Sequence, residues 1–163
     1  MKSTDKFLIG IVVGIILLVV AAFVVTLTRP EPTQQAEDSP EGVAHNYLLA
    51  LQEQDYQCAY GYLSPTLKGY PISAEMFAED VEGSSWHFRL DADTTLAVAS
   101  ARVTGNRAVV DVRESRFHGG DWFDSSQSTT IFEMKLQFED GEWKIVDSDY
   151  YFARCWKDNK GCK

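Results

Sequence analysis

Among the acidic and histidine side chains beyond residue 42, we select seven candidates for proton transfer in catalysis: His45, His87, His118, Asp111, Glu114, Asp147 and Asp149. Such a group must be positioned in a cavity to act as a general acid or base. Side chains alternate between the two faces of a strand, which directs Asp111 away from the apolar face of its segment. The same alternation directs Asp147 to the face of Trp143 and Ile145, so Asp147 is the candidate for a cavity.

No second group is arranged beside Asp147 to complete a catalytic pair. The sequence also lacks a G-x-S-x-G motif, a phosphate-binding loop and a cluster of histidines at metal-binding spacing. We therefore predict that the chain is not an enzyme and that it uses no cofactor and no metal.

Three cysteines offer redox chemistry. Cys155 and Cys162 are close in sequence and are separated by W-K-D-N-K-G, which can turn the chain. We predict a disulfide between them in an oxidising compartment, although three cysteines also allow a pairing of Cys58 with Cys155. Cys58 falls in an apolar helical pattern, which favours a buried free thiol.

Two short segments have the composition of contact surfaces. Residues 118–124 (H-G-G-D-W-F-D) form the expected tip of a hairpin, where Trp122 and Phe123 have little to bury them. Adjacent exposed aromatic residues often mark an interface, although a loop can also fold them back over a sheet edge. Gly10 and Gly14 form a G-x-x-x-G groove that allows a second membrane helix to approach closely.

The elements that position these residues begin with an apolar segment. Residues 7–27 contain no charge, and sixteen of these twenty-one residues are Leu, Ile, Val or Phe. As a helix they would be about 31 Å long, which matches a bilayer core of roughly 30 Å. We predict a transmembrane helix over 7–28. The segment is longer than the core of a cleaved signal peptide, the alternative, and it ends in a poor cleavage site.

The flanking charges set the expected orientation. Two lysines precede the segment and Arg29 follows it, so residues 1–6 are predicted to be cytoplasmic and the rest of the chain extracytoplasmic. The predicted location is therefore the cell membrane, with the lipid bilayer as one partner. A membrane-protein partner, or self-association through the span, would be the other.

The remaining chain divides by composition. Residues 29–42 are rich in proline and charge and predict a linker. Residues 43–153 are long enough for one domain and carry a net charge of −10, which disfavours nucleic acid as a partner. Residues 154–163 read as a basic, cysteine-containing tail.

Helices are expected before strands within the domain. The first helix begins at Ser39-Pro40-Glu41, the second is capped by Asp55, and the third runs from Ser73 to Gly83. Alternating apolar residues then predict strands over 86–90, 95–104, 107–117, 128–139 and 142–152. The predicted fold class is α+β, with three helices packed on a curved antiparallel sheet beyond the transmembrane helix.

The domain resembles the nuclear transport factor 2-like superfamily. The likeness is carried by D-Y-x-x-A-Y-x-x-L-S-P at residues 55–65 and by G-x-W-K-I at residues 141–145. The resemblance implies a cone-shaped α+β fold. The superfamily includes isomerases, dehydratases, cyclases, transport factors and non-catalytic membrane-tethered domains, and its enzymes use an Asp, His or Tyr inside the cone.

Two functions are compatible with these observations. The first is a membrane-anchored, non-catalytic binding or scaffolding module, such as an accessory subunit of a membrane complex. The alternative is a cone that binds a small apolar ligand or catalyses an isomerase- or dehydratase-type step. A deep polar cavity around Asp147 would favour the alternative, and a cone filled by Tyr and Trp would favour the first.

Overall fold

The computed structural model describes residues 3–27, 33–89, 93–119 and 126–162. The chain forms two compact units, Met1–Thr33 and Gln34–Lys163. We describe each unit by itself.

The first unit contains helix α1 (Ser3–Leu27), so the helix expected over residues 7–27 is present. Its side chains are described from Leu8 to Val24, and all of them are exposed within the chain. Over the described residues, we find no helix that is both long and apolar enough to meet the criteria for a membrane span.

The first three helices of the second unit begin where their capping residues predict. The Ser39 hydroxyl accepts a hydrogen bond from the Gly42 amide (3.1 Å) at the start of α2, and Asp55 caps α3 through the Cys58 amide (3.0 Å). Ser73 caps α4 in the same way through Met76. The helices are α2 (Pro40–Gln52), α3 (Tyr56–Gly61) and α4 (Ala74–Gly83).

The strand expected over 86–90 is instead a short helix, α5 (Ser85–Phe88). A period of two over five residues is a weak signal, and tertiary contacts outweigh it here. The helical turn places Phe88 against Trp156, with ring centroids 5.9 Å apart, and leaves Trp86 76% exposed. The amide of Tyr151 donates to the carbonyl of His87 (2.8 Å), which fixes the turn to the chain near the C-terminus.

Four strands form an antiparallel sheet in the order β1-β2-β3-β4. Two-residue turns join β1 to β2 and β3 to β4, and the second turn uses positive φ at Asp140 and Gly141 (52° and 93°), as an Asp-Gly hairpin requires. The strands are β1 (Thr94–Thr104), β2 (Arg107–His118), β3 (Ser126–Glu139) and β4 (Glu142–Ser148). The α+β class is confirmed, and β4 ends four residues before the predicted strand does.

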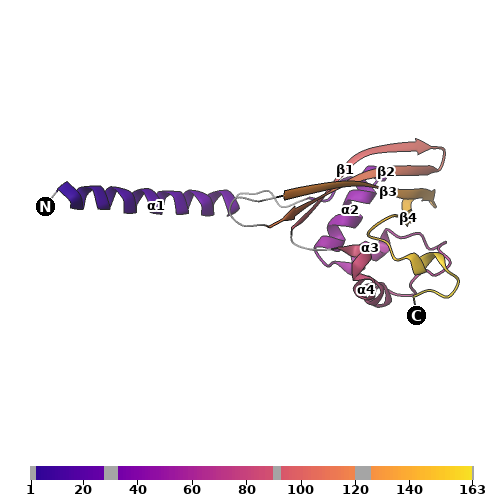
Figure 1. Cartoon of the computed structure of the whole chain (residues 1–163). Helices are drawn as coiled ribbons and strands as arrows, with labels where there is room; N and C mark the ends of the chain where they lie inside the picture. The colour runs from indigo at the N-terminus through magenta and orange to yellow at the C-terminus, as the bar shows by residue number, and fades with distance from the viewer. Residues whose placement is uncertain (1–2, 28–32, 90–92, 120–125, 163) are drawn as a thin grey trace. The chain divides into compact units, whose positions relative to one another are not determined.

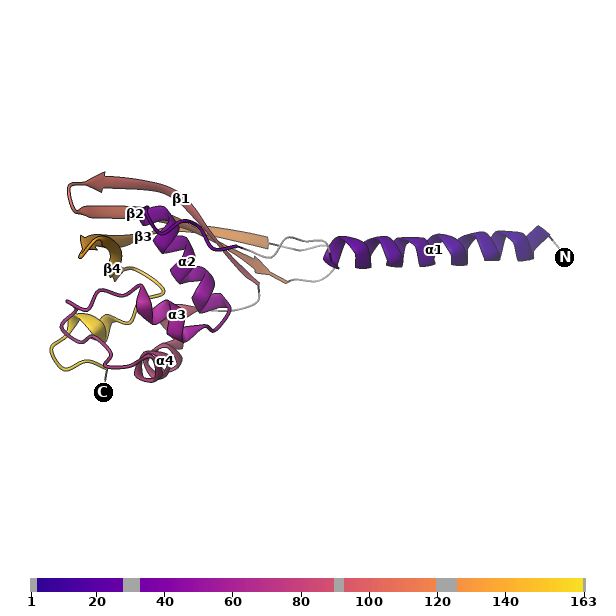
Figure 2. The same cartoon turned by 180° about the vertical axis from the view of Figure 1, so that it is seen from behind.

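One face of the sheet packs against the helices (Figures 1 and 2). An aromatic core fills the space between them. The Tyr47 hydroxyl donates to the Tyr151 carbonyl (2.6 Å), so this buried polar group is satisfied. Burial raises the pKa of Tyr47 far above its ordinary value. We use the name aromatic core for six side chains that are at most 1% exposed: Tyr47, Phe77, Phe88, Tyr151, Phe152 and Trp156.

The predicted basic tail belongs to this core. Trp156 is completely buried, stacks on Phe77 at 5.1 Å and donates its indole N–H to Asp80 (2.7 Å). Burial raises the pKa of Asp80, and the bond from Trp156 partly opposes that shift. Most residues of 154–163 are charged or polar, so the composition of this segment did not reveal that Trp156 anchors it in the core.

The predicted linker is also shorter than its composition suggested. The buried Asn46 side chain accepts from the amide of Gln35 (2.7 Å) and donates to its carbonyl (2.9 Å). The Tyr62 hydroxyl donates to Glu37 (2.6 Å). Residues from Gln34 onward are therefore part of the domain, because polar groups of α2 and of the residues after α3 bind this segment.

Candidate functional site

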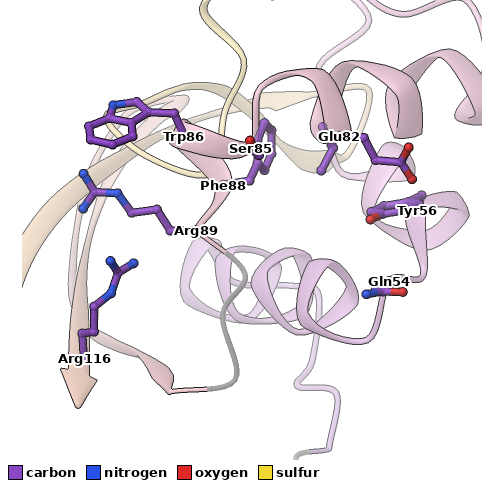
Figure 3. A pocket seen from close by; sticks show the side chains of 9 residues that line it. Gln54, Tyr56, Glu82, Ser85, Trp86, Phe88, Arg89 and Arg116 are labelled. Carbon is purple, nitrogen blue, oxygen red and sulfur yellow. The ribbon is translucent and has the colours of Figure 1, made fainter. Parts of the chain in front are cut away.

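A cavity of about 630 Å³ lies between α5, the start of α3 and strand β2 (Figure 3). We call it the rim pocket. Its volume is in the range of small-molecule sites in proteins. Nine residues line it: Gln54, Tyr56, Val81, Glu82, Ser85, Trp86, Phe88, Arg89 and Arg116.

Two arginines enter the rim pocket from different elements. Arg89 follows α5 directly, and Arg116 lies near the end of β2 and extends toward Arg89 in Figure 3. Arg116 follows Val112 and Glu114 at two-residue intervals, so the inner face of β2 changes from apolar to charged as it leaves the core.

Glu114 lies beside both guanidinium groups and is only 4% exposed. Its Oε1 is 3.4 Å from Arg116 Nη2 and 4.0 Å from Arg89 Nη1. We call these three residues the arginine cluster. A carboxylate is rarely buried unless a cation compensates it, and here two guanidinium groups lie beside one carboxylate.

Aromatic rings fix the position of Arg89. Its guanidinium carbon is 4.5 Å from the centroid of the Tyr150 ring and 5.6 Å from that of Trp86, both within the range of cation–π interaction. The side chain is 26% exposed, so its charged end is open to the pocket while its position is restrained.

The backbone at the pocket is strained. Arg89 has φ 38° and ψ 44°, and Gln54 has φ 60°, so both occupy the left-handed region. This region costs a residue with a side chain about 1–2 kcal/mol. Such strain persists only where the surrounding structure imposes it, and it is concentrated at functional sites.

The structure places Asp147 outside the core, which corrects its predicted orientation. The pairing of β3 with β4 shifts between Lys135 and Leu136, so that Ile145 pairs with Leu136 and Asp147 pairs with Lys135. Val146 is the extra residue of this β-bulge, and it reverses the alternation that placed Asp147 inward.

Asp147 is bonded to lysines on this outer side. Its carboxylate accepts from Lys135 (3.1 Å) and contacts Lys157. Partial burial acts to raise the pKa of Asp147, but the bonds from the two lysines outweigh it and hold the pKa below its ordinary value. Asp147 is therefore an ion-pair residue and does not line a cavity.

The other proton-transfer candidates are dispersed. Asp111 lies on the outer face, as predicted, and binds Ser100 (2.7 Å) and Arg102 (3.0 Å). Asp149 is exposed, and His45 and His87 are half-buried on α2 and α5. The side chain of His118 is outside the described part of the structure. Among the candidates whose side chains are described, Glu114 forms ion pairs with two residues that line the rim pocket, Arg89 and Arg116.

The disulfide between Cys155 and Cys162 is present, and Cys58 is a free thiol. Cys58 is half-buried, less than its apolar context predicts, and its sulfur is 4.0 Å from the Tyr62 hydroxyl. Within the described residues, no group of three or more His, Cys, Asp or Glu side chains is arranged to hold a metal ion.

The predicted contact residues are only partly described. Trp122 and Phe123 lie outside the described residues. Gly10 and Gly14 lie within α1, and a Cβ atom at either position would meet no described atom within 4 Å.

No protein-family model matches the sequence, and no curated protein matches it. Solved structures that match the fold include a SEC-C motif-containing protein from Rhodopseudomonas palustris, with a TM-score of 0.49 and 13% identity over 72% of this chain and 83% of that chain. They also include an NTF2-like protein with a cystatin-like fold from Novosphingobium aromaticivorans, with a TM-score of 0.46 and 11% identity over 71% of this chain and 84% of that chain. A third is a protein of unknown function with a cystatin-like fold from Nostoc punctiforme, with a TM-score of 0.44 and 10% identity over 65% of this chain and 82% of that chain.

Sequence reasoning missed the rim pocket. The strand predicted over 86–90 includes Arg89, and no sequence pattern points to Arg116. One signal was available, because basic residues are scarce in residues 43–153, with eight against eighteen acidic ones. A buried or half-buried arginine in so acidic a domain is a candidate for a specific interaction.

Proposed function

We propose that this chain is a membrane-tethered, non-catalytic binding domain of the nuclear transport factor 2-like type. In this proposal α1 is the tether and the rim pocket is the binding site. The observation that carries it is the division of the interior: aromatic side chains fill the space between sheet and helices, and the open volume lies at the edge beside charged and aromatic groups.

The filled interior supports binding rather than catalysis. Tyr47, Tyr151 and Trp156 are completely buried between the sheet and the helices, where a catalytic cone would need an open cavity. Asp147, the residue expected to serve there, is bonded to Lys135 on the other side of the sheet. The isomerase- or dehydratase-type alternative therefore lacks the group on which it depended.

The composition of α1 supports the tether. Its apolar side chains from Leu8 to Val24 are exposed within the chain, and exposed apolar surface of this extent calls for lipid or a protein partner to cover it. The lysines before α1 favour a cytoplasmic N-terminus and an extracytoplasmic domain. The groove at Gly10 and Gly14 suits a second membrane helix, from another protein or from a second copy.

Membrane fractionation of the full chain tests the tether. We expect the protein to remain in the membrane pellet through an alkaline carbonate wash, and its domain to be digested by protease added from outside. Replacing Ile15 and Leu18 by Lys should release it, since each central Lys costs about 2.5–3.5 kcal/mol of insertion. A wild-type chain found in the wash, or as a soluble form starting between residues 23 and 29, would refute the tether.

Affinity purification in mild detergent tests the groove. Gly10→Leu with Gly14→Leu should reduce the recovery of a membrane-protein partner or of a second tagged copy. The matched control is Ala21→Leu with Ala22→Leu, which adds similar bulk elsewhere on the helix. Equal recovery from both double variants would show that the glycines are not a contact surface.

A further inference from the structure

We infer that the rim pocket binds a small organic monocarboxylate, whose carboxylate pairs with Arg89 and whose apolar part lies along Trp86, Tyr56 and Phe88. This inference names the ligand class of the binding site and therefore rests on the proposed function. It follows from the charge, the hydrogen-bonding capacity and the walls of the pocket.

Positive charge is concentrated in the rim pocket of an otherwise acidic domain. Residues 43–153 carry eight basic side chains, and two of them line this one cavity. Glu114 lies closer to Arg116 (3.4 Å) than to Arg89 (4.0 Å), and Glu82 is exposed at the far side of the cavity in Figure 3. Arg89 is therefore the guanidinium with which a ligand carboxylate can pair.

Arg89 has hydrogen-bonding capacity to spare. Its closest approach to Glu114 is 4.0 Å, which is beyond hydrogen-bond distance, and its guanidinium makes no hydrogen bond to any described residue. Guanidinium presents five N–H donors in a planar fork that matches the two oxygens of a carboxylate. The rings of Tyr150 and Trp86 hold this fork in place, so little side-chain freedom is lost when a ligand binds.

The domain's charge favours a single negative charge on the ligand. A net charge of −10 in residues 43–153 repels polyanions such as nucleoside triphosphates, whereas pairing with Arg89 can offset the repulsion of a single negative charge. Affinity must then come largely from apolar contact. Trp86, Tyr56, Phe88 and Val81 supply that surface, and the volume of about 630 Å³ accommodates a ring system or a medium alkyl chain.

Calorimetric titration of the full chain in nanodiscs of uncharged lipid tests this assignment. The probes are benzoate, 2-naphthoate and decanoate, each compared with its neutral amide, together with inorganic phosphate. We expect the acids to bind at least about tenfold more tightly than their amides, the gain typical of a hydrogen bond between charged groups. Phosphate should bind more weakly than 2-naphthoate, because it has no apolar part.

Three variants locate the site. Arg89→Gln should weaken 2-naphthoate binding at least about tenfold, whereas Arg102→Gln, an exposed arginine bonded to Asp111 on the outer face, should leave it unchanged. Trp86→Ala should weaken 2-naphthoate binding more than phosphate binding, because phosphate has no apolar part to contact the ring. Trp86 is 76% exposed, so its removal should not affect folding, which thermal unfolding of each variant verifies.

Any of three results would overturn the inference. The acids and their amides could bind with equal affinity, or no probe could bind with a dissociation constant below about 1 mM. The Arg89 and Arg102 variants could also reduce binding equally. If one of them occurs while the chain still resists the carbonate wash, the ligand class is wrong and the tethered domain stands. If the acids bind as expected but the chain is washed off, the tether is wrong and the pocket assignment stands.

Discussion

The aromatic core and the arginine cluster are adjacent in the chain and opposite in character. Phe88 belongs to the core at 1% exposure, and the next residue, Arg89, points its charge into the rim pocket. In the core, the Tyr47 hydroxyl donates to the Tyr151 carbonyl and the Trp156 indole donates to Asp80. In the cluster, the backbone is strained and the donors of Arg89 are open to a ligand.

Stability and binding therefore depend on separate residues in this domain. Removing core side chains should destabilise the fold by amounts that follow the apolar volume lost. Changes in the cluster should alter binding while leaving stability nearly constant or improving it. Substitutions in the core and in the cluster can test this difference, and the core substitution has the largest expected effect.

Trp156→Ala should have the largest effect. It removes a fully buried ring that stacks on Phe77 and leaves the buried Asp80 carboxylate without its indole donor. We expect a loss of about 3–5 kcal/mol in the free energy of unfolding, measured by urea denaturation. The control is Trp86→Ala, with an expected change below about 0.5 kcal/mol. Similar losses from both substitutions would remove the distinction between core and rim.

Removal of the disulfide should have the next largest effect. Cys155 and Cys162 are seven positions apart, and closing so short a loop contributes about 2–3 kcal/mol through the entropy of the unfolded chain. Replacing both by Ser should lower the free energy of unfolding by up to that amount, because the bridge restrains the loop that carries Trp156. Peptide mapping without reduction should first show the two cysteines joined, and a cross-linked peptide that contains Cys58 would contradict the assignment.

The strain at Arg89 should be measurable with a matched pair of substitutions. Arg89→Gly and Arg89→Ala both remove the guanidinium and its contact with Tyr150. Only glycine accepts φ 38° without strain, so Arg89→Gly should be more stable than Arg89→Ala by about 1 kcal/mol. Both should lose carboxylate binding. Equal stabilities in thermal unfolding would show that Arg89 is not strained.

Two acids should respond to pH in opposite directions. The pKa of Asp147 lies below its ordinary value, so its contribution is present above the unfolded-state pKa and is lost as the pH falls through the folded-state pKa. The pKa of Asp80 is raised by burial, so the folded protein binds this proton more readily than the unfolded chain does. Asp80 therefore favours the folded protein as the pH falls and disfavours it as the pH rises. The effects should each be below about 1 kcal/mol, as for surface and half-buried groups.

Unfolding measured from pH 3 to pH 7 with the Asn variants separates these two acids. Relative to Asp147→Asn, the wild-type protein should lose stability toward pH 3. Relative to Asp80→Asn, it should gain stability in the same direction. Parallel curves for the wild type and either variant would rule out that residue as the source of the pH dependence.

Local signals predicted much of the fold, because they are encoded by neighbouring residues. Ser39, Asp55 and Ser73 cap helices through bonds that span three positions, and Asp140-Gly141 forms its turn alone. These elements require no knowledge of the rest of the chain. The α+β class followed from their order.

The rim pocket could not be predicted in this way, because distant segments create it. Arg89 and Arg116 are brought together only when α5 packs beside β2, and α5 itself forms because Phe88 and Trp156 meet in the core. The predicted orientation of Asp147 was wrong for a related reason. A bulge of one residue reverses the face to which every later side chain of the strand points, and the apolar pattern of β4 does not reveal where the bulge lies.

That bulge has a counterpart at the opposite edge of the sheet. β1 carries an extra residue, Ala99, between Val98 and Ser100, and β4 carries Val146 after Ile145. Loss of a single codon within a strand ordinarily turns every later side chain to the wrong face. At these two positions the loss would instead restore a regular ladder, with Val98 and Ile145 still facing inward. The two outermost strands can therefore lose one residue without a change in which side chains face the core. The same loss within β2 or β3 would turn the later apolar side chains of that strand from the core to the outer face.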